Sequence, residues 1–169
     1  MREKLVRLTV YTDYSLRLLM YLALKDRDLS TIADVAEKYN ISKNHLMKVA
    51  HQLGVAGYIE TVRGMRGGLR LAMPAESIRI GQLVLHTEPA MALVLCFEPV
   101  NSPCPIQRFC VLQTALAKAC TTFIEVLDGY TLRDLVKPRT SLRNLLSITT
   151  DGHVPPPTGS RRAKRANVK

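Results

Sequence analysis

The chain has 169 residues, a formal net charge of +10 and 47% hydrophobic residues. This length holds one core domain of ordinary size plus appendages, and no apolar run approaches the roughly 20 residues that span a bilayer. The N-terminus lacks the apolar region and cleavage site of a signal peptide, so we expect a cytoplasmic protein. The positive charge indicates a polyanionic partner, nucleic acid first and an anionic membrane surface second, although residues 161–169 carry part of the excess.

The first amphipathic helix is predicted to begin within residues 12–15 (Thr-Asp-Tyr-Ser). Thr12 or Asp13 can accept hydrogen bonds from the free backbone N–H groups at a helix start. From this segment alone we interpret Asp13 as a cap that favours the helix dipole rather than as a ligand. The apolar face of the helix follows at helical spacing: Leu16, Leu19, Met20, Ala23 and Leu24.

A helix-turn-helix is predicted next. Asp34 follows Thr31 by three residues, the spacing of a capping box, so Ser30 and Thr31 open the second helix. Asn40 suits the tight turn because it tolerates left-handed backbone, and Ser42 is expected to cap the third helix. The third helix is polar and basic on its outer side, as in helices that read DNA. Its expected DNA contacts are Ser42, Lys43, Asn44, His45 and Lys48.

Residues 57–71 are predicted to form a β-hairpin, the wing of a winged helix. Gly64 and Gly67 allow a sharp turn, and Arg63 and Arg66 at its tip suit phosphate contact or a narrow minor groove. The alternatives are a solvated turn or a nucleotide cradle, but no helix opens after the turn and no Lys-Ser/Thr pair follows it. We therefore expect Arg63, Arg66 and Gly67 to contact DNA.

A short helix over residues 78–85 is predicted to end at Thr87-Glu88-Pro89, and a cysteine-rich segment follows. Cys96, Cys104 and Cys110 fall within fifteen residues. Thiolates at this density can bind zinc or an iron–sulfur cluster, and in a reducing compartment clustered cysteines are more often metal ligands than disulfides. A loop with incidental buried or disulfide-bonded cysteines is the alternative.

A long helix is predicted after the cysteines, with an apolar stripe broader than a small monomer needs to bury. We interpret it as a dimerisation helix, because a palindromic DNA site asks for a two-fold protein. Cys120 lies on the stripe and is interpreted as a core residue rather than a ligand. From residue 151 onward Gly, Pro and basic residues dominate, a composition typical of disorder.

These elements predict a mainly α fold with a small β-hairpin wing, namely a winged helix-turn-helix plus a long dimerisation helix. The expected units are a DNA-binding domain (1–75), a linker helix with the cysteine segment and dimerisation helix (76–136), and a basic, proline-containing tail that is disordered (137–169). We find no paired carboxylates, nucleophile motif or phosphate cradle in a suitable context, so no enzyme is expected.

Several stretches resemble the NsrR nitric-oxide-sensing repressors, which belong to the winged-helix iron–sulfur regulator family that includes IscR and RirA. They are residues 7–17 (RLTVYTDYSLR), 41–49 (ISKNHLMKV), 62–64 (VRG) with 67–71 (GGLRL), and 127–132 (LDGYTL). With the three cysteines before the long helix, the resemblance covers residues 6–136 and is specific in combination.

The resemblance implies that Cys96, Cys104 and Cys110 bind an iron–sulfur cluster, either 2Fe–2S or 4Fe–4S. It also implies that Asp13 is the fourth ligand, given by the partner subunit of a homodimer, which reverses its interpretation as a cap. A carboxylate oxygen is a harder, weaker ligand for iron than a thiolate, so one iron is comparatively open to nitric oxide. The first cysteine spacing is nearer that of RirA, whereas Asp13 itself favours NsrR over RirA, and Gln113 favours it over IscR.

The expected function is a dimeric repressor that senses nitric oxide, binds palindromic double-stranded operator DNA and releases it when the cluster is nitrosylated. No membrane partner is expected. Two alternatives stay open: an iron-responsive or iron–sulfur-homeostasis regulator of the same family, and a structural-zinc DNA-binding protein without a sensory role.

Overall fold

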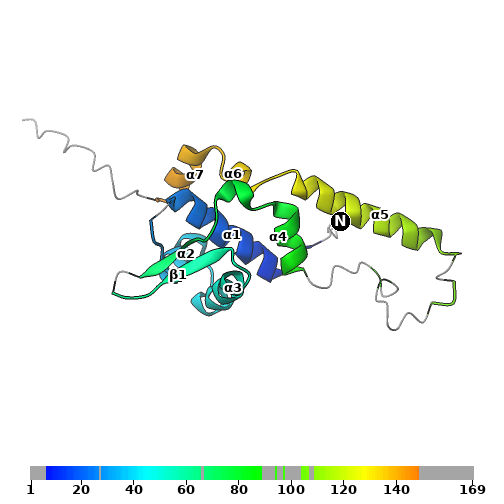
Figure 1. The fold of residues 1–169 in the computed structure, drawn as a ribbon, viewed down its shortest axis with the longest axis horizontal. Helices are drawn as coiled ribbons and strands as arrows, with labels where there is room; N and C mark the ends of the chain where they lie inside the picture. The colour runs from blue at the N-terminus through cyan, green and yellow to red at the C-terminus, as the bar shows by residue number, and fades with distance from the viewer. Residues whose placement is uncertain are drawn as a thin grey trace, which may run out of the picture.

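The protein is a set of helices with one two-stranded antiparallel sheet (Figure 1). The structure is a computed structural model, and it describes residues 7–26, 28–65, 67–88, 94, 97, 104–106 and 109–148. In chain order the elements are α1 (Val10–Lys25), α2 (Ile32–Tyr39), α3 (Lys43–Val55), β1 (Ile59–Val62), β2 (Gly68–Leu71), the 3-10 turn η1 (Ala75–Ser77), α4 (Ile80–Thr87), α5 (Val111–Asp128), α6 (Leu132–Leu135) and α7 (Arg139–Leu145). This is the mainly helical, winged helix-turn-helix fold that the sequence predicts.

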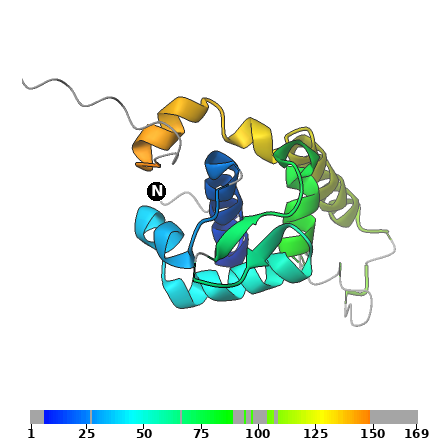
Figure 2. The ribbon, with the colours of Figure 1, turned by 60° about the vertical axis from the view of Figure 1, so that its left-hand side comes forward.

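Helix α1 is the centre of the core. Leu18, Leu19 and Leu24 are fully buried. The helix contacts α2, α3, β2, α4, α6 and α7, and Figures 1 and 2 show it in dark blue with these elements around it. A displacement of α1 would therefore disturb the packing of both helices of the helix-turn-helix.

The start of α1 differs from the prediction. The helix begins at Val10, and Thr9 is the N-cap, whose hydroxyl accepts a hydrogen bond from the Thr12 N–H at 3.3 Å. Thr12 is buried inside the helix and Asp13 lies in its first turn, so neither residue caps it. The earlier start brings Tyr11 onto the helix, where it packs against the core. Thr9 and Thr12 are three residues apart, and the sequence alone favoured the wrong threonine.

The helix-turn-helix is confirmed, including the capping box and the tight turn that were predicted for it. The Thr31 N–H donates to Asp34 Oδ2 at 2.9 Å and the Asp34 N–H donates to Thr31 Oγ1 at 3.1 Å, which completes the capping box. Asn40 ends α2 in the left-handed conformation, with φ of 51°. The chain can therefore turn sharply into α3.

The wing is the hairpin of β1 and β2. Ile59 pairs with Leu71 and Val62 with Gly68, and the buried side chains of the hairpin face the core. Gly64 has φ of +120°, a conformation that residues with a Cβ rarely adopt, and its carbonyl accepts from the Gly67 N–H at 2.9 Å. The turn is thus held by its own backbone, as the glycines predicted.

Helix α5 lies along α4 and extends beyond the rest of the molecule (Figure 1). The approach of the two helices is close at Gly81, where a Cβ would lie 2.6 Å from Asp128 Cβ and 2.8 Å from the Ile124 carbonyl oxygen. None of the residues of α5 is buried. None of the helices in the described residues combines the length and apolar character of a membrane crossing.

The structure shortens the predicted tail. Helix α7 forms within it, and Ile148 is buried in the core at 8% exposure. Arg139 and Arg143 donate to the carbonyls of the last turn of α1, which lack partners within the helix, and both pair with Asp26. Residues 137–148 are therefore part of the fold, contrary to the prediction, and residues 149–169 lie outside the described part of the chain.

Candidate nucleic-acid interface and cysteine segment

The predicted DNA contacts of α3 all lie on its solvent face. Leu46, Val49 and Leu53 are buried against the core and fix the orientation of the helix. The five residues singled out from the sequence are exposed: Ser42, Lys43, Asn44, His45 and Lys48. The structure brings them together as one polar, basic surface.

The N-terminus of α3 has no side-chain cap. Ser42 stands at the N-cap position, as predicted, but its hydroxyl makes no cap hydrogen bond. The first backbone N–H groups of a helix have no partners within it, and the helix dipole makes this end favourable for anions. The end of α3 that carries Lys43 can thus accept a phosphate by backbone and side chain together.

A groove of about 1140 Å³ separates the beginning of α1 from α3. The rings of Tyr14 and His45 meet across it with centroids 6.3 Å apart. His86, which the sequence analysis did not include in any site, lines the same groove and contacts the Tyr58 ring at 5.8 Å. The first turns of α1 are therefore in direct contact with the DNA-facing end of α3.

The wing carries an exposed tip. Arg63 is exposed, and Gly67 cannot be replaced without a collision, since a Cβ there would meet the Val62 carbonyl oxygen and lie 2.9 Å from that of Gly64. Met65 is completely exposed beside them. Arg66 lies outside the described residues. The tip is free for contact with a partner, as the prediction requires.

Asp13 lies on α1 with about half of its side chain exposed, at 47%. The Arg17 Nε donates to its Oδ1 at 3.0 Å, and the Arg17 guanidinium also lies over the Tyr39 ring, 5.8 Å from the centroid. In the described part of the chain this ion pair uses one carboxylate oxygen only. Asp13 can thus face a second group without first giving up Arg17.

Cys104, Cys110 and Cys120 are free, half-buried thiols, and Cys96 lies outside the described residues. Cys110 is the N-cap of α5, and its Sγ accepts from the Gln113 N–H at 3.4 Å. Among the described residues of one chain, no three Cys, His, Asp or Glu side chains gather closely enough to hold a metal ion. Asp13, Cys104 and Cys110, all of which the structure describes, therefore do not form such a group within one chain.

A network between α1 and α4 was not predicted. Glu88, at the end of α4, accepts hydrogen bonds from the Thr9 N–H at 2.6 Å, the Thr9 hydroxyl at 2.9 Å and the Thr12 hydroxyl at 2.5 Å. Thr12 Oγ1 also lies 2.9 Å from Thr87 Oγ1. Burial raises the pKa of Glu88, but the hydrogen bonds from Thr12 and Thr9 outweigh it and hold that pKa below its usual range. The carboxylate is therefore ionised at neutral pH.

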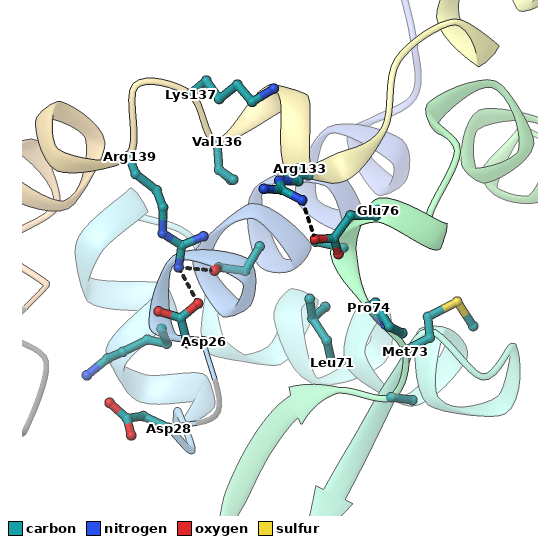
Figure 3. Close-up of a pocket in the computed structure, with 14 residues that line it drawn as sticks. Asp26, Asp28, Leu71, Met73, Pro74, Glu76, Arg133, Val136, Lys137 and Arg139 are labelled. Atoms are coloured by element: carbon teal, nitrogen blue, oxygen red, sulfur yellow. Dashed lines mark hydrogen bonds and ion pairs between the residues drawn. The ribbon is translucent and has the colours of Figure 1, made fainter.

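A second cavity, of about 1090 Å³, lies at the other end of α1 (Figure 3). Two ion pairs lie in it: Arg139 pairs with Asp26 at 2.5 Å and Arg133 pairs with Glu76 at 2.8 Å. Both pairs join the C-terminal helices to earlier segments of the chain. This cavity is best understood as the junction between α1, η1 and the C-terminal helices.

Comparison with known proteins places this architecture. Residues 8–138 match the profile of the Rrf2 family, described as "Iron-dependent Transcriptional regulator". The chain belongs to the Rrf2 family. It is 48% identical to the "HTH-type transcriptional regulator NsrR" of Bacillus subtilis (strain 168) over 144 residues, which are 85% of this chain and 99% of the relative. The Rrf2 chain is thus a transcriptional regulator and not an enzyme.

The fold is shared with solved structures, among them one of CymR and one of IscR. The oxidized form of Staphylococcus aureus CymR is similar with a TM-score of 0.61 and 28% identity, covering 78% of this chain and 97% of that one. T. potens IscR is similar with a TM-score of 0.65 and 22% identity, covering 82% of this chain and 91% of that one. At this level of identity the second likeness concerns the fold alone.

Proposed function

We propose that this Rrf2 protein is a dimeric repressor that binds palindromic operator DNA, carries an iron–sulfur cluster and releases DNA in response to nitric oxide. The observation that carries the proposal is the similarity to NsrR over 99% of that relative and 85% of this chain, which has an exposed reader helix and free thiols.

DNA binding rests on the surface of α3 and the wing. Asn44 and His45 at the start of α3 are placed for base edges in the major groove, and Lys43 and Lys48 for phosphates or guanine. Arg63 at the wing tip suits the adjacent minor groove. Replacing Lys43 by Ala should weaken binding for all sequences and reduce the salt slope by about one counterion. Lys118→Ala is the matched control, because Lys118 is exposed on α5 away from the reader surface.

Dimer formation rests on the uncovered side of α5. Apolar side chains stay exposed along the helix in the single chain: Val111 at 82%, Leu112 at 63%, Phe123 at 37% and Val126 at 58%. Burying such side chains stabilises association by about 25 cal/mol per Å² of apolar surface. A second copy of α5 is the partner that also gives the two-fold symmetry of a palindromic site.

The residues present fit an iron–sulfur cluster by their chemistry. Cys104 and Cys110 are reduced thiols near the start of α5, and a helix N-terminus favours negatively charged groups such as metal-bound thiolates. Cys96 would complete a three-cysteine set. Asp13 is half-exposed and forms no three-residue ligand group with Cys104 and Cys110 of its own chain, which fits a ligand supplied from the partner subunit. When bound, the cluster would supply an iron that reacts with nitric oxide.

The expected response of the chain to loss of the cluster follows from the positions of the proposed ligands. Cys104 precedes α5 in sequence and Cys110 is its N-cap residue. Release of their thiols from a metal would therefore free that end of the helix. Release of Asp13 leaves its carboxylate to Arg17 alone. Asp13 is part of α1 and α5 packs on α4, and both α4 and α3 contact α1.

The test is an anaerobic absorption spectrum with iron and sulfide analysis, combined with operator binding before and after nitric oxide. The expected result is a coloured protein whose cluster and operator affinity are both lost on nitric oxide addition. Bleaching of the cluster with unchanged operator binding would contradict the sensing role. Cys110→Ser should abolish the cluster, whereas Cys120→Ser should keep it, because Cys120 lies on the same helix outside the proposed ligand set.

The family description as iron-dependent favours one second candidate, an iron-responsive regulator. The two functions separate in one titration, because a chelator would release the operator from an iron sensor without any nitric oxide. A colourless anaerobic preparation that contains zinc would instead indicate a structural-zinc protein.

A further inference from the structure

The hydrogen bonds of Glu88 join two segments that are 79 residues apart. Its Oε1 accepts three of them from Thr9 and Thr12, in the cap and first turn of α1. A carboxylate at this place also faces the positive end of the α1 dipole. Thr12 is fully buried and its hydrogen bond to Glu88 is partly shielded from water, whereas the two hydrogen bonds from Thr9 are exposed.

The position of Glu88 in the sequence relates its contact with α1 to the proposed cluster ligands. Glu88 is the C-cap residue of α4. In sequence it directly precedes the segment that carries Cys96, Cys104 and Cys110. On the other side of the contact, Thr12 directly precedes Asp13. A single carboxylate therefore connects the beginning of the cysteine segment with the turn that presents the proposed fourth ligand.

The same turn of α1 continues to the reader helix. Tyr14 is two residues beyond Thr12, and its ring meets that of His45 at 6.3 Å. His45 is exposed among the proposed DNA contacts of α3. Glu88 thus contacts Thr12 and His45 contacts Tyr14, and the backbone of α1 joins the two contacts between the end of α4 and the DNA-facing surface.

We propose that Glu88 is a positioning residue that ties the cysteine segment to the first turn of α1 and thereby sets the position of the reader helix. The proposal deepens the proposed function and rests on it, since a change in the cysteine segment has to reach α3. Without the Glu88 contacts, the cysteine segment can still hold its ligand. The positions of α1 and α3 then no longer depend on whether the ligand is bound.

A purely structural cap is the competing explanation, and it makes a different prediction. A cap that only stabilises α1 would, when lost, lower stability and weaken operator binding equally with and without the cluster. A positioning residue changes the ratio between the two affinities, because coupling is a free-energy difference between two states. The ratio is therefore the quantity to measure.

The variants are Glu88→Gln, which keeps the size of the side chain but removes its charge, and Thr12→Val, which removes the donor hydroxyl. Glu76→Gln is the matched control, because Glu76 is a carboxylate in an exposed ion pair with Arg133, away from the start of α1. Full-length protein is used, cluster-loaded and apo, with an operator fragment at one fixed salt concentration. Fluorescence anisotropy gives the affinities, and iron analysis gives the cluster content.

We expect Glu88→Gln and Thr12→Val to retain the cluster but to lower the ratio of loaded to apo operator affinity by about fivefold or more. Glu76→Gln should keep the wild-type ratio. Because Glu88 and Thr12 act through one contact, the double variant should lower the ratio no further than either single one. An unchanged ratio in both single variants, with the cluster retained, overturns the proposal.

A second readout does not depend on the cluster. Hydrogen exchange of the apo protein should accelerate in Glu88→Gln at residues 10–14 and also at residues 43–46, by about threefold or more at both. Acceleration at residues 10–14 alone overturns the connection to α3. If wild-type protein shows the same operator affinity loaded and apo, the proposed function fails, and the exchange pattern still decides whether Glu88 positions α3.

Discussion

The close approach of α4 and α5 leads to a prediction whose size follows from the structure. Gly81 lies inside α4, and a Cβ added there would be 2.6 Å from Asp128 Cβ, 2.8 Å from the Ile124 carbonyl oxygen and 2.9 Å from Asp128 Cα. Two of these atoms belong to the α5 backbone and cannot rotate away. Gly81→Ala must therefore push the two helices apart.

The magnitude combines two opposing effects. Overpacking costs about 1–3 kcal/mol, while Ala is favoured over Gly in a helix interior by about 1 kcal/mol. Because the obstructing atoms are backbone, the upper part of the first range applies, and Gly81→Ala should lower the free energy of unfolding by about 1–2 kcal/mol. Gly54→Ala is the matched control in α3, since its nearest atoms would be 3.9 Å away. It should raise stability by about 0.5–1 kcal/mol.

The assay is urea unfolding followed by far-UV circular dichroism at one protein concentration, because dimer formation makes apparent stability depend on concentration. The two variants should move the midpoint in opposite directions with equal slopes. If Gly81→Ala stabilised the protein as much as Gly54→Ala, the packing of α5 on α4 described above would be wrong.

Three further predictions concern single side chains. Thr31→Ala should cost about 1 kcal/mol of unfolding free energy by thermal denaturation, because it removes half of a capping box, whereas Ser42→Ala should cost little stability but weaken operator binding. Arg143→Ala should lower stability by about 1–2 kcal/mol, since its Nε donates to the Leu24 carbonyl at 2.8 Å and the side chain is only 25% exposed. Glu88 has a lowered pKa, so it contributes stability above about pH 4.3 that is lost as pH falls through its folded value. The unfolding midpoint should therefore fall less between neutral and acidic pH in Glu88→Gln than in the wild type.

The sequence predicted the DNA-binding half of the molecule well because its signals are local. A capping box depends on residues three apart, Asn40 needs only its own backbone conformation, and the outer face of α3 follows from helical periodicity. The glycines of the wing likewise indicate a turn at their own positions. Each of these features could be read without knowing what lies next to it in space.

The remaining features depend on contacts between distant segments. Nothing near Glu88 in sequence shows that Thr9 and Thr12 will donate to it, and nothing near Arg143 shows that it completes the last turn of α1. Residues 137–148 were assigned to the tail because Lys137-Pro138 was expected to end the preceding helix. The start of α1 was misplaced because its cap is stabilised by Glu88, a residue that only the fold brings there. The ligand roles of Cys96, Cys104, Cys110 and Asp13 stay predictions.

Helix α4 is a connector with two fixed ends, and this limits how a signal can reach DNA. At its start, the Gln82 N–H donates to Asp128 Oδ1 at 3.3 Å and Gly81 holds α5 close. At its end, Glu88 holds α1 through Thr12. Since α5 packs mainly on α4, a rearrangement of α5 at a dimer interface has to move α4, and a movement of α4 has to pull on the first turn of α1. The reader helix α3 then moves with α1. The spacing of the two reader helices in a dimer therefore depends on the contacts at both ends of α4 remaining intact.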